Sequence, residues 1–206
     1  MTGRAHPHLT GHLVDGDLTL ADTKTTWPVA STELVYDTPY AQVRKDTIVD
    51  PAGHQHPRVV VQPNGAVGVL ALDEDDRVLL VQQYRHPVGK RMLELPAGTL
   101  DVAGESPIDA ARRELAEEAD VVAAEWSRLL IAHASPGYSS EAWEVFLAIA
   151  LTPVADDERT VREAEEADME HWWMPFGEAL GAVAEGRITD AMTVAGLLAL
   201  HAQRTR

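Results

Sequence analysis

Apolar and polar residues alternate with a period of two along STELVYDTPYAQVRKDTIVD, residues 31–50. A turn at residues 51–53 follows, and the apolar run HPRVVVQP comes next. A period of two is typical of strands that bury one face, with turn residues between them. We therefore predict a small antiparallel sheet from residues 31 to 64. Its alternating apolar positions are Leu34, Tyr36, Tyr40, Val43 and Ile48.

Two continuous apolar runs follow, AVGVLAL at residues 66–72 and VLLVQQ at residues 78–83. Strands that are buried on both faces lack the polar alternation of half-exposed strands. The short polar segment DEDDR separates the runs, so we predict a hairpin of well-buried strands. Further strands are expected at residues 128–132, 143–150 and 169–174.

The strongest helix signal lies at residues 107–119. Ser106 is suited to the N-cap, Pro107 to the first helical position, and Asp109 completes an S-x-x-D capping pattern. Strands and helices are thus mixed within one compact unit, which indicates α/β or α+β layering. Two further helices are predicted near the end of the chain, at residues 176–185 and 189–203.

Residues 1–30 are polar, rich in histidine and only weakly periodic. We interpret them as an extension outside the main fold. His6, His8 and His12 could bind a metal ion, although a solvated arm is the simpler explanation. The same alternatives apply to the two histidines of the turn sequence GHQHP.

The composition is that of an ordinary globular protein, with 206 residues of which 45% are hydrophobic and 24% charged. The chain contains no cysteine, which excludes disulfides and thiolate metal sites. Its formal net charge is −16. The electric field of a protein with this negative charge repels nucleic acids and anionic membranes, so we expect neither as a partner. Because the sequence has no apolar N-terminal signal and no run of about 18 apolar residues, it predicts a cytoplasmic protein.

The helix predicted at residues 107–119 carries a group of acidic residues in the stretch RRELAEEADV. On a helix, Glu114, Glu117 and Glu118 would lie about 5–6 Å apart on one face. Two carboxylates at that distance repel by about 3 kcal/mol at an effective dielectric of about 20. Arg113 can pair with Glu117, which leaves Glu114 and Glu118 without a local partner. The face is therefore either a solvated acidic surface or the site of a hard cation such as Mg²⁺.

The residues before this helix favour the cation. In ELPAGTLDVAGESP, the positions of Pro96, Gly98 and Gly104 indicate a tight loop that leads directly into the helix. A glycine-rich loop lets backbone amides and carbonyls approach a metal ion or a phosphate closely. Glu105 stands at the end of the loop and can bring a fourth carboxylate to the same helix face.

The loop and the helix together resemble the signature box of the Nudix hydrolases, G-x5-E-x7-R-E-U-x-E-E-x-G-U, in which U is an aliphatic residue. The match runs from Gly98 through Glu105 to Val121. Two positions depart from the pattern. Six residues, not five, separate Gly98 from Glu105, and Asp120 stands where the box has glycine. Aspartate tolerates a left-handed helix cap better than most residues, so we expect an intact site at a small cost in stability.

The resemblance implies a fold and a metal site. The fold would be an α/β/α sandwich with a mixed sheet. Members of the family usually cleave a diphosphate linked to another group, and metal ions on a diphosphate neutralise charge and activate water. Mg²⁺ is the implied ion, with Mn²⁺ as its substitute. The implied ligands are Glu114, Glu118, Glu117, Glu105 and the backbone carbonyl of Ala97.

Two flanking segments resemble the ADP-ribose pyrophosphatases of this family, QQYRHPVGKRMLELPAG at residues 82–98 and SPGYSSE at residues 135–141. Arg85 is a suitable residue for a pyrophosphate because its planar fork binds oxygens bidentately. It could instead be an ordinary charge at a strand end, and Glu94 a structural hydrogen-bond acceptor. The substrate contacts that this resemblance implies are Arg85, Glu94, Gly98, Pro136 and Gly137.

Glu141 matches the loop glutamate that positions or deprotonates the attacking water in such enzymes. Small neighbours, Gly137 and Ser139 among them, make the loop flexible enough to close over a substrate. The alternative is a mobile surface acid. Glu117 is the second candidate for the catalytic base, and Arg113 would hold Glu117 in place.

The segment at residues 31–64 resembles the N-terminal sheet of the same subfamily, which commonly exchanges between two subunits. We therefore expect a homodimer with an exchanged N-terminal sheet. Arg58 and Tyr40 would help to hold the nucleoside, although sheet packing explains them equally well. The implied organisation is an extension at residues 1–30, the dimerisation region, and a catalytic domain at residues 65–206.

The expected activity is Mg²⁺-dependent hydrolysis of the pyrophosphate bond of ADP-ribose, which gives AMP and ribose 5-phosphate. Other nucleoside diphosphate sugars, of the ADP-glucose or GDP-mannose type, are alternative substrates. A Nudix sensor that binds ADP-ribose without hydrolysing it is the alternative from a different class. Such sensors usually have a degraded box, whereas the carboxylates here are complete.

Overall fold

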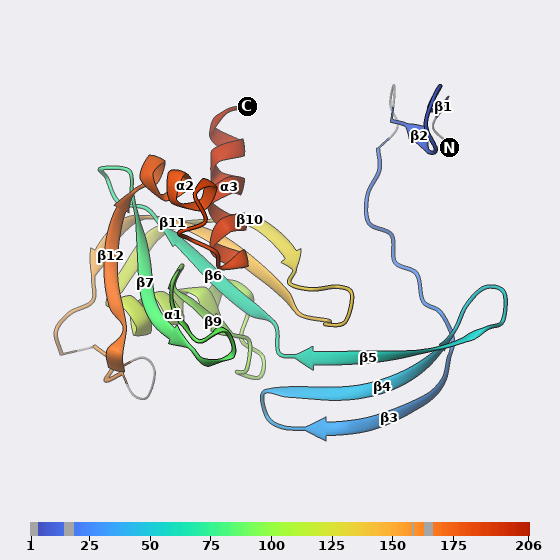
Figure 1. Ribbon diagram of the computed structural model, residues 1–206. Helices are drawn as coiled ribbons and strands as arrows, with labels where there is room; N and C mark the ends of the chain where they lie inside the picture. Colours follow the sequence, from blue (N-terminus) through green and yellow to red (C-terminus); the bar gives the residue numbers. More distant parts are fainter. Residues whose placement is uncertain (1–3, 15–18, 158, 163–166) are drawn as a thin grey trace.

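The computed structural model describes residues 4–14, 19–157, 159–162 and 167–206. Within them, a four-stranded and a three-stranded sheet form the body of the protein (Figure 1). The four-stranded sheet has the order β10-β11-β6-β9, with strands Val121–His133, Ala142–Pro153, Ala66–Ala71 and Ala97–Thr99. The three-stranded sheet has the order β12-β7-β8, with strands Glu170–Pro175, Arg77–Arg85 and Lys90–Glu94. β6 and β11 are parallel and their other neighbours antiparallel, so the sheet is mixed as predicted.

Helices cover both faces of the strand β6. Val67 and Val69 pack in one cluster with the helix α1 (Pro107–Ala119). Leu70 points the other way and packs with α2 (Phe176–Ala184) and α3 (Ala191–Arg204). Because both faces of β6 are covered, its residues do not alternate between apolar and polar, and the strand is apolar throughout. The predicted α/β/α sandwich is confirmed.

The predicted hairpin between residues 66–72 and 78–83 is wrong. β6 and β7 belong to different sheets, and only the bridge between Leu72 and Val78 joins them at the turn. β7 pairs instead with β8 and β12 on its two sides. A continuous apolar run identifies a strand with two buried faces, but it contains no signal for the strand that it pairs with.

The helix α1 has the predicted bounds and the predicted caps. The N–H of Asp109 donates to Ser106 Oγ at 3.3 Å, and Pro107 is the first helical residue. Asp120 ends the helix in the left-handed conformation, with φ 53° and ψ 34°. The segment before the helix differs from the expected loop, because residues 97–99 pair with β6 as the short strand β9.

The remaining elements agree with the sequence, with shifts at their ends. β10 begins at Val121, seven residues before the predicted start at residue 128, and pairs with β11 along its length. The starts of α2 and α3 lie within two residues of those predicted. A short 3-10 helix at His86–Val88 links β7 to β8. No described helix is long and apolar enough to cross a membrane.

The N-terminal strands form the predicted antiparallel sheet, in the order β3-β4-β5. The strands are Val29–Asp37, Ala41–Val49 and Gln55–Pro63, and the sheet extends away from the body in Figure 1. All residues of β3 are exposed, so this sheet buries little apolar surface within one chain. A pair of two-residue strands, β1 (Arg4–Ala5) and β2 (His12–Leu13), lies farther out along the extension.

Candidate active site

Arg113 lies at the centre of the acidic cluster on α1. Its guanidinium donates to both carboxylate oxygens of Glu105 at 3.1 Å, to Glu114 Oε1 at 2.7 Å and to Glu117 Oε2 at 3.0 Å. The hydrogen bonds with Glu105 are the largest cause that raises the pKa of Arg113 above its usual value. The predicted pair with Glu117 and the approach of Glu105 are therefore both present. The expectation that Glu114 has no local partner is wrong.

Glu118 is nearly buried, with 5% of its surface exposed. Its Oε2 atom accepts a hydrogen bond from the N–H of Ala97 at 2.9 Å. The carboxylate is thus held against β9 by a residue 21 positions earlier in the chain, a partner that the sequence did not predict. The sequence suggested this approach only indirectly, because the strand that brings Ala97 to the helix was expected to be a loop.

Gly98 on β9 lies directly against the side chain of Glu114 on α1. A Cβ atom built on Gly98 would lie 2.0 Å from the carboxyl carbon of Glu114, far inside any real contact. Only glycine leaves room for this carboxylate, because any other residue carries a Cβ. The structure therefore explains the first glycine of the box by the space that Glu114 needs, whereas a substrate contact at Gly98 remains a prediction.

Arg85 and Glu94 form a bidentate ion pair beside this cluster. Arg85 Nη2 donates to Glu94 Oε2 at 2.7 Å, and Arg85 Nε lies 3.0 Å from Glu94 Oε1. These bonds raise the pKa of Arg85. Glu94 is 4% exposed and also accepts from Gln83 Nε2. Glu94 is thus a structural acceptor that orients the guanidinium, and both residues line the same cavity.

The cavity has a volume of about 490 Å³. Arg85, Glu141 and the strand β9 meet there, although they come from three separate parts of the chain. Burial raises the pKa of Glu141, so its carboxylate binds a proton more readily than an exposed glutamate. The lining residues are Ala66, Arg85, Pro87, Val88, Met92, Glu94, Ala97, Gly98, Thr99, Glu141, Thr189, Asp190, Ala191 and Met192.

Residues 62–193 match the family model of the NUDIX domain. The ADP-ribose pyrophosphatase of Mycobacterium tuberculosis is 41% identical over 175 residues, which are 85% of this chain and 83% of that protein. The chain belongs to the Nudix family. The prediction of a Nudix hydrolase is confirmed. The methanol dehydrogenase activator of Bacillus methanolicus is 31% identical over 172 residues, 84% of this chain and 91% of that protein. A crystal structure of an ADP compounds hydrolase shares the fold, with a TM-score of 0.75 at 20% identity, over 89% of this chain and 96% of that chain.

The carboxylates of the Nudix box suit a hard divalent cation by their chemistry. Three of them surround Arg113, which supplies the neutralising positive charge in this structure. No three Asp, Glu or His side chains of the described residues converge as a preformed metal cage. The ion pairs with Arg113 hold three of these carboxylates at the guanidinium, and carboxylate oxygens are the ligands that a hard cation prefers. The residues present therefore fit a divalent ion.

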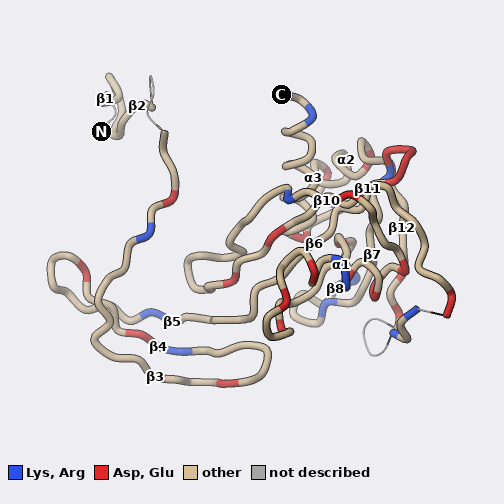
Figure 2. The backbone as a smooth tube through the Cα atoms, turned by 180° about the vertical axis from the view of Figure 1, so that it is seen from behind, with Lys and Arg blue, Asp and Glu red and all other residues tan. Residues whose placement is uncertain are grey.

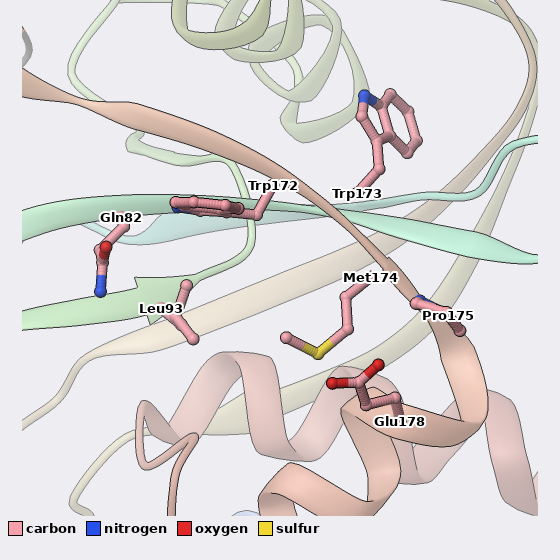
Figure 3. Close-up of a pocket in the computed structure, with 7 residues that line it drawn as sticks. All are labelled: Gln82, Leu93, Trp172, Trp173, Met174, Pro175 and Glu178. Carbon is pink, nitrogen blue, oxygen red and sulfur yellow. The ribbon is translucent and has the colours of Figure 1, made fainter.

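Acidic residues are spread over the whole Nudix domain and over the N-terminal sheet (Figure 2). Net charge alone therefore does not single out the cavity. What distinguishes it is Arg85, a cation held in place beside the box. A second hollow of about 380 Å³ lies over β12, with Trp172, Met174, Leu93 and Glu178 in its lining (Figure 3). That hollow has no basic lining residue, so it is unsuited to a diphosphate.

Four predicted substrate contacts do not line the cavity of a single chain. Pro136 and Gly137 are exposed on the loop between β10 and β11. Tyr40 is 79% exposed at the turn between β3 and β4, and Arg58 Nη1 donates to the neighbouring carbonyl of Pro57. Within one chain, the structure does not bring these four together with Arg85, and their roles remain predictions.

The loop that carries Glu141 is tied to the N-terminal sheet. The N–H of Val61 on β5 donates to Tyr138 O at 2.9 Å, and the N–H of Ser140 donates to Val61 O at 3.0 Å. The loop also closes on itself, since the N–H of Ala134 donates to Glu141 O. Glu141 therefore sits on a braced loop, which differs from the mobile surface acid of the alternative interpretation.

Several residues at the cavity were not predicted from the sequence. Asp190 caps α3, where its Oδ2 accepts from the N–H and the hydroxyl of Thr193. Thr193 in turn accepts from the N–H of Leu95, which fixes α3 against the end of β8. The sequence TDAMT before an apolar helix was the signal that could have identified this cap. Met92 and Val88 supply apolar lining, and no sequence signal marks them.

Proposed function

We propose that this chain hydrolyses the pyrophosphate bond of ADP-ribose and releases AMP and ribose 5-phosphate, with Mg²⁺ as its ion. The observation that carries the proposal is the shared cavity of Arg85, Glu141 and the strand β9 of the Nudix box. The likeness to an ADP-ribose pyrophosphatase at 41% identity supports the choice of substrate. A volume of about 490 Å³ is within the usual range of small-molecule sites.

Arg85 would bind the diphosphate. Its fork is held rigidly by the buried carboxylate of Glu94, while 44% of its side chain stays exposed. A guanidinium fixed in this way loses little conformational freedom when it binds phosphate oxygens, and its charge persists at every physiological pH. Glu94 therefore acts on the substrate through Arg85.

The box carboxylates would hold the cation. Glu114 and Glu118 are the central ligands, Glu117 and Glu105 contribute, and the Ala97 carbonyl completes the set. Bound Mg²⁺, or Mn²⁺ in its place, supplies charge neutralisation on the diphosphate and lowers the pKa of bound water. Arg113 orients Glu105, Glu114 and Glu117 by its hydrogen bonds.

Glu141 would orient the attacking water and accept its proton. The oxygen of the water forms a new bond to one phosphorus while the bridging P–O bond breaks, and the bridging oxygen leaves with the other phosphate. The raised pKa of Glu141 makes its carboxylate a better proton acceptor than an exposed glutamate. Glu117 is the second candidate for the base, but its Oε2 atom already accepts a hydrogen bond from Arg113 at 3.0 Å.

The protein would function as a cytoplasmic homodimer. Leu34, Tyr36 and Val59 are more than half exposed on the N-terminal sheet, which is a surface that a second copy can bury. In a dimer with exchanged sheets, Arg58 and Tyr40 could reach the partner's cavity and hold the nucleoside. Pro136 and Gly137 lie on the loop that pairs with β5, at the junction between the sheet and the cavity.

The experiment that tests the proposal is product analysis over a panel of substrates. ADP-ribose, ADP-glucose, GDP-mannose and NADH are incubated with the full chain and Mg²⁺, and the products are separated by chromatography. AMP and ribose 5-phosphate from ADP-ribose, with the highest kcat/KM of the panel, support the proposal. Preference for another nucleotide sugar would overturn the substrate. ADP-ribose binding in calorimetry without cleavage of any compound would instead favour a sensor.

A further inference from the structure

Asp120 ends the catalytic helix in a conformation that glycine adopts more easily. Its φ is 53° and its ψ 34°, and its N–H donates to Ala116 O at 3.2 Å. The left-handed conformation is strained for residues with a Cβ, and the Nudix pattern has glycine at this position. What aspartate adds at this position, compared with glycine, is a side chain that ends in a carboxylate.

The carboxylate of Asp120 binds Arg162. Arg162 Nη2 donates to Asp120 Oδ2 at 2.6 Å, and Arg162 Nε donates to the backbone carbonyl of Glu117 at 3.0 Å. The two side chains are only 20% and 22% exposed, so solvent weakens this pair less than a surface pair. One guanidinium thus joins the cap residue to the carbonyl of a box glutamate, although it comes from the segment between β11 and β12.

The end of α1 needs such a donor. The last carbonyls of a helix have no partner within it, and the negative end of the helix dipole favours a cation. The last turn of α1 contains no basic residue. His171 supplies another outside donor, with its Nε2 atom 2.5 Å from Glu118 O. A carbonyl only accepts, so this nitrogen carries the proton.

We propose that Arg162 is a positioning residue that acts with Asp120 to hold the last turn of α1 and align Glu117. The inference rests on the proposed function, in which the glutamates of that turn hold the divalent ion. Glu118 is fixed at both ends, by His171 at its carbonyl and by Ala97 at its carboxylate. Glu117 is fixed by Arg162 at its carbonyl and by Arg113 at its carboxylate.

The aspartate at the cap and the arginine that binds it, Asp120 and Arg162, depend on each other. Without Arg162, the charge of Asp120 would face the negative end of the helix dipole and the neighbouring box carboxylates. Without Asp120, Arg162 would keep its bond to Glu117 O but lose its ion pair. The aspartate is therefore acceptable in this box because Arg162 is present.

The test uses the full chain and three single variants, Arg162→Met, Arg162→Lys and Asp120→Gly. A double variant combines Arg162→Met with Asp120→Gly. Arg159→Met is the matched control, because Arg159 lies in the same segment and pairs with the exposed Asp156. Amide hydrogen exchange of the metal-free protein reports the last turn of α1, and calorimetry with Mn²⁺ alone reports the affinity of the site.

Arg162→Met should speed exchange in the last turn of α1 and weaken Mn²⁺ binding by about tenfold, as the loss of supporting hydrogen bonds does in other metal sites. Arg162→Lys should give an exchange rate and an Mn²⁺ affinity between those of Arg162→Met and the parent chain. Arg159→Met should match the parent chain in both. In the Asp120→Gly background the effect of Arg162→Met should be smaller, because the uncompensated charge is gone.

Unchanged exchange in the last turn with Arg162→Met would overturn the inference, even if that variant folds poorly elsewhere. Faster exchange together with Mn²⁺ affinity within about twofold of the parent would also overturn it, since the pair would then stabilise the helix without positioning the site. Failure of the parent chain itself to bind Mn²⁺ would overturn the metal site of the proposed function. That result is distinct from the two outcomes of Arg162→Met that overturn the inference.

Discussion

The carboxylate of Glu114 occupies the space that a side chain at position 98 would need. A Cβ atom on Gly98 would lie 2.0 Å from both Cδ and Oε1 of Glu114. Gly98→Ala must therefore displace the carboxylate or the strand β9. We expect a loss of about 1–3 kcal/mol in the free energy of unfolding and at least about a tenfold loss of kcat/KM. Urea denaturation and kinetics measure the two effects.

Gly181→Ala in α2 is the control for that substitution, because a Cβ there meets nothing within 4 Å. It should leave kcat/KM unchanged and raise stability by about 0.5–1 kcal/mol, as alanine does within a helix. Equal activity of the Gly98→Ala and Gly181→Ala proteins would show that the position of Glu114 does not matter to the reaction.

Glu118→Gln separates the metal role of this residue from its structural role. Glutamine keeps a side-chain oxygen that can accept from the N–H of Ala97, so the melting temperature of the metal-free protein should change little. The loss of a charged ligand should lower kcat by at least about 100-fold and raise the Mg²⁺ concentration required for activity. Glu178→Gln, which lines the hollow over β12, is the matched control. Unchanged turnover of Glu118→Gln would remove Glu118 from the metal site.

The pH dependence of kcat tests Glu141 as the base. A base must be deprotonated to act, so activity falls as the pH drops through its pKa. Burial raises the pKa of Glu141, so this acidic limb should lie above the pH of about 4.3 at which an ordinary glutamate titrates. Glu141→Gln should remove the limb and lower kcat by about 10²–10⁴-fold. A comparable loss of Mn²⁺ affinity in this variant would contradict the assignment, because a base that holds no metal should leave that affinity intact.

Arg85→Lys tests the bidentate contact with the diphosphate. Lysine keeps the charge and loses the fork that Glu94 holds. We expect the KM for ADP-ribose to rise by about tenfold or more, with a smaller change in kcat. Arg91→Lys serves as the control. Arg91 lies on the neighbouring strand β8 and pairs with Asp168 and Glu170, outside the cavity. If both variants have the same KM, Arg85 does not contact the substrate.

Light scattering tests the dimer. Leu34 is 56% exposed on β3, and a charge there would face the second copy. Leu34→Glu should shift the protein from dimer to monomer at micromolar concentration, because an unpaired charge in a buried interface is costly. Glu33→Gln, at the adjacent position, should leave the mass unchanged. A parent chain with the mass of a monomer would rule out the exchanged sheet.

The sequence was sufficient for the features that depend on short-range chemistry. Ser106 and Pro107 predicted the start of α1, since a hydroxyl that caps a helix and a ring that fits its first turn act locally. Asp120 was expected to end the helix in the left-handed conformation, and it does. The box glutamates could be placed on one helix face because the helical period fixes their spacing.

The sequence did not predict the contacts between segments that are distant in the chain. The apolar runs of β6 and β7 predicted buried strands but not their placement in separate sheets, because burial on two faces leaves strand pairing unspecified. The hydrogen bond that holds Glu118 was missed for the same reason, because it comes from Ala97 on a strand that pairs with β6. The bond between Arg113 and Glu114 joins neighbouring residues, and the sequence predicted only the pairing of Arg113 with Glu117.

By itself, then, the sequence determined the identity of the reactive groups, since residue types and helical spacing establish where three carboxylates and an arginine share a face. The tertiary structure alone decided what surrounds them. It placed Arg85 and Glu141 in one cavity and brought Arg162 to the end of α1, although Arg162 lies 42 positions after Asp120 in the chain. Those contacts follow from the packing of distant segments, which depends on the whole core and has no local signal in the chain.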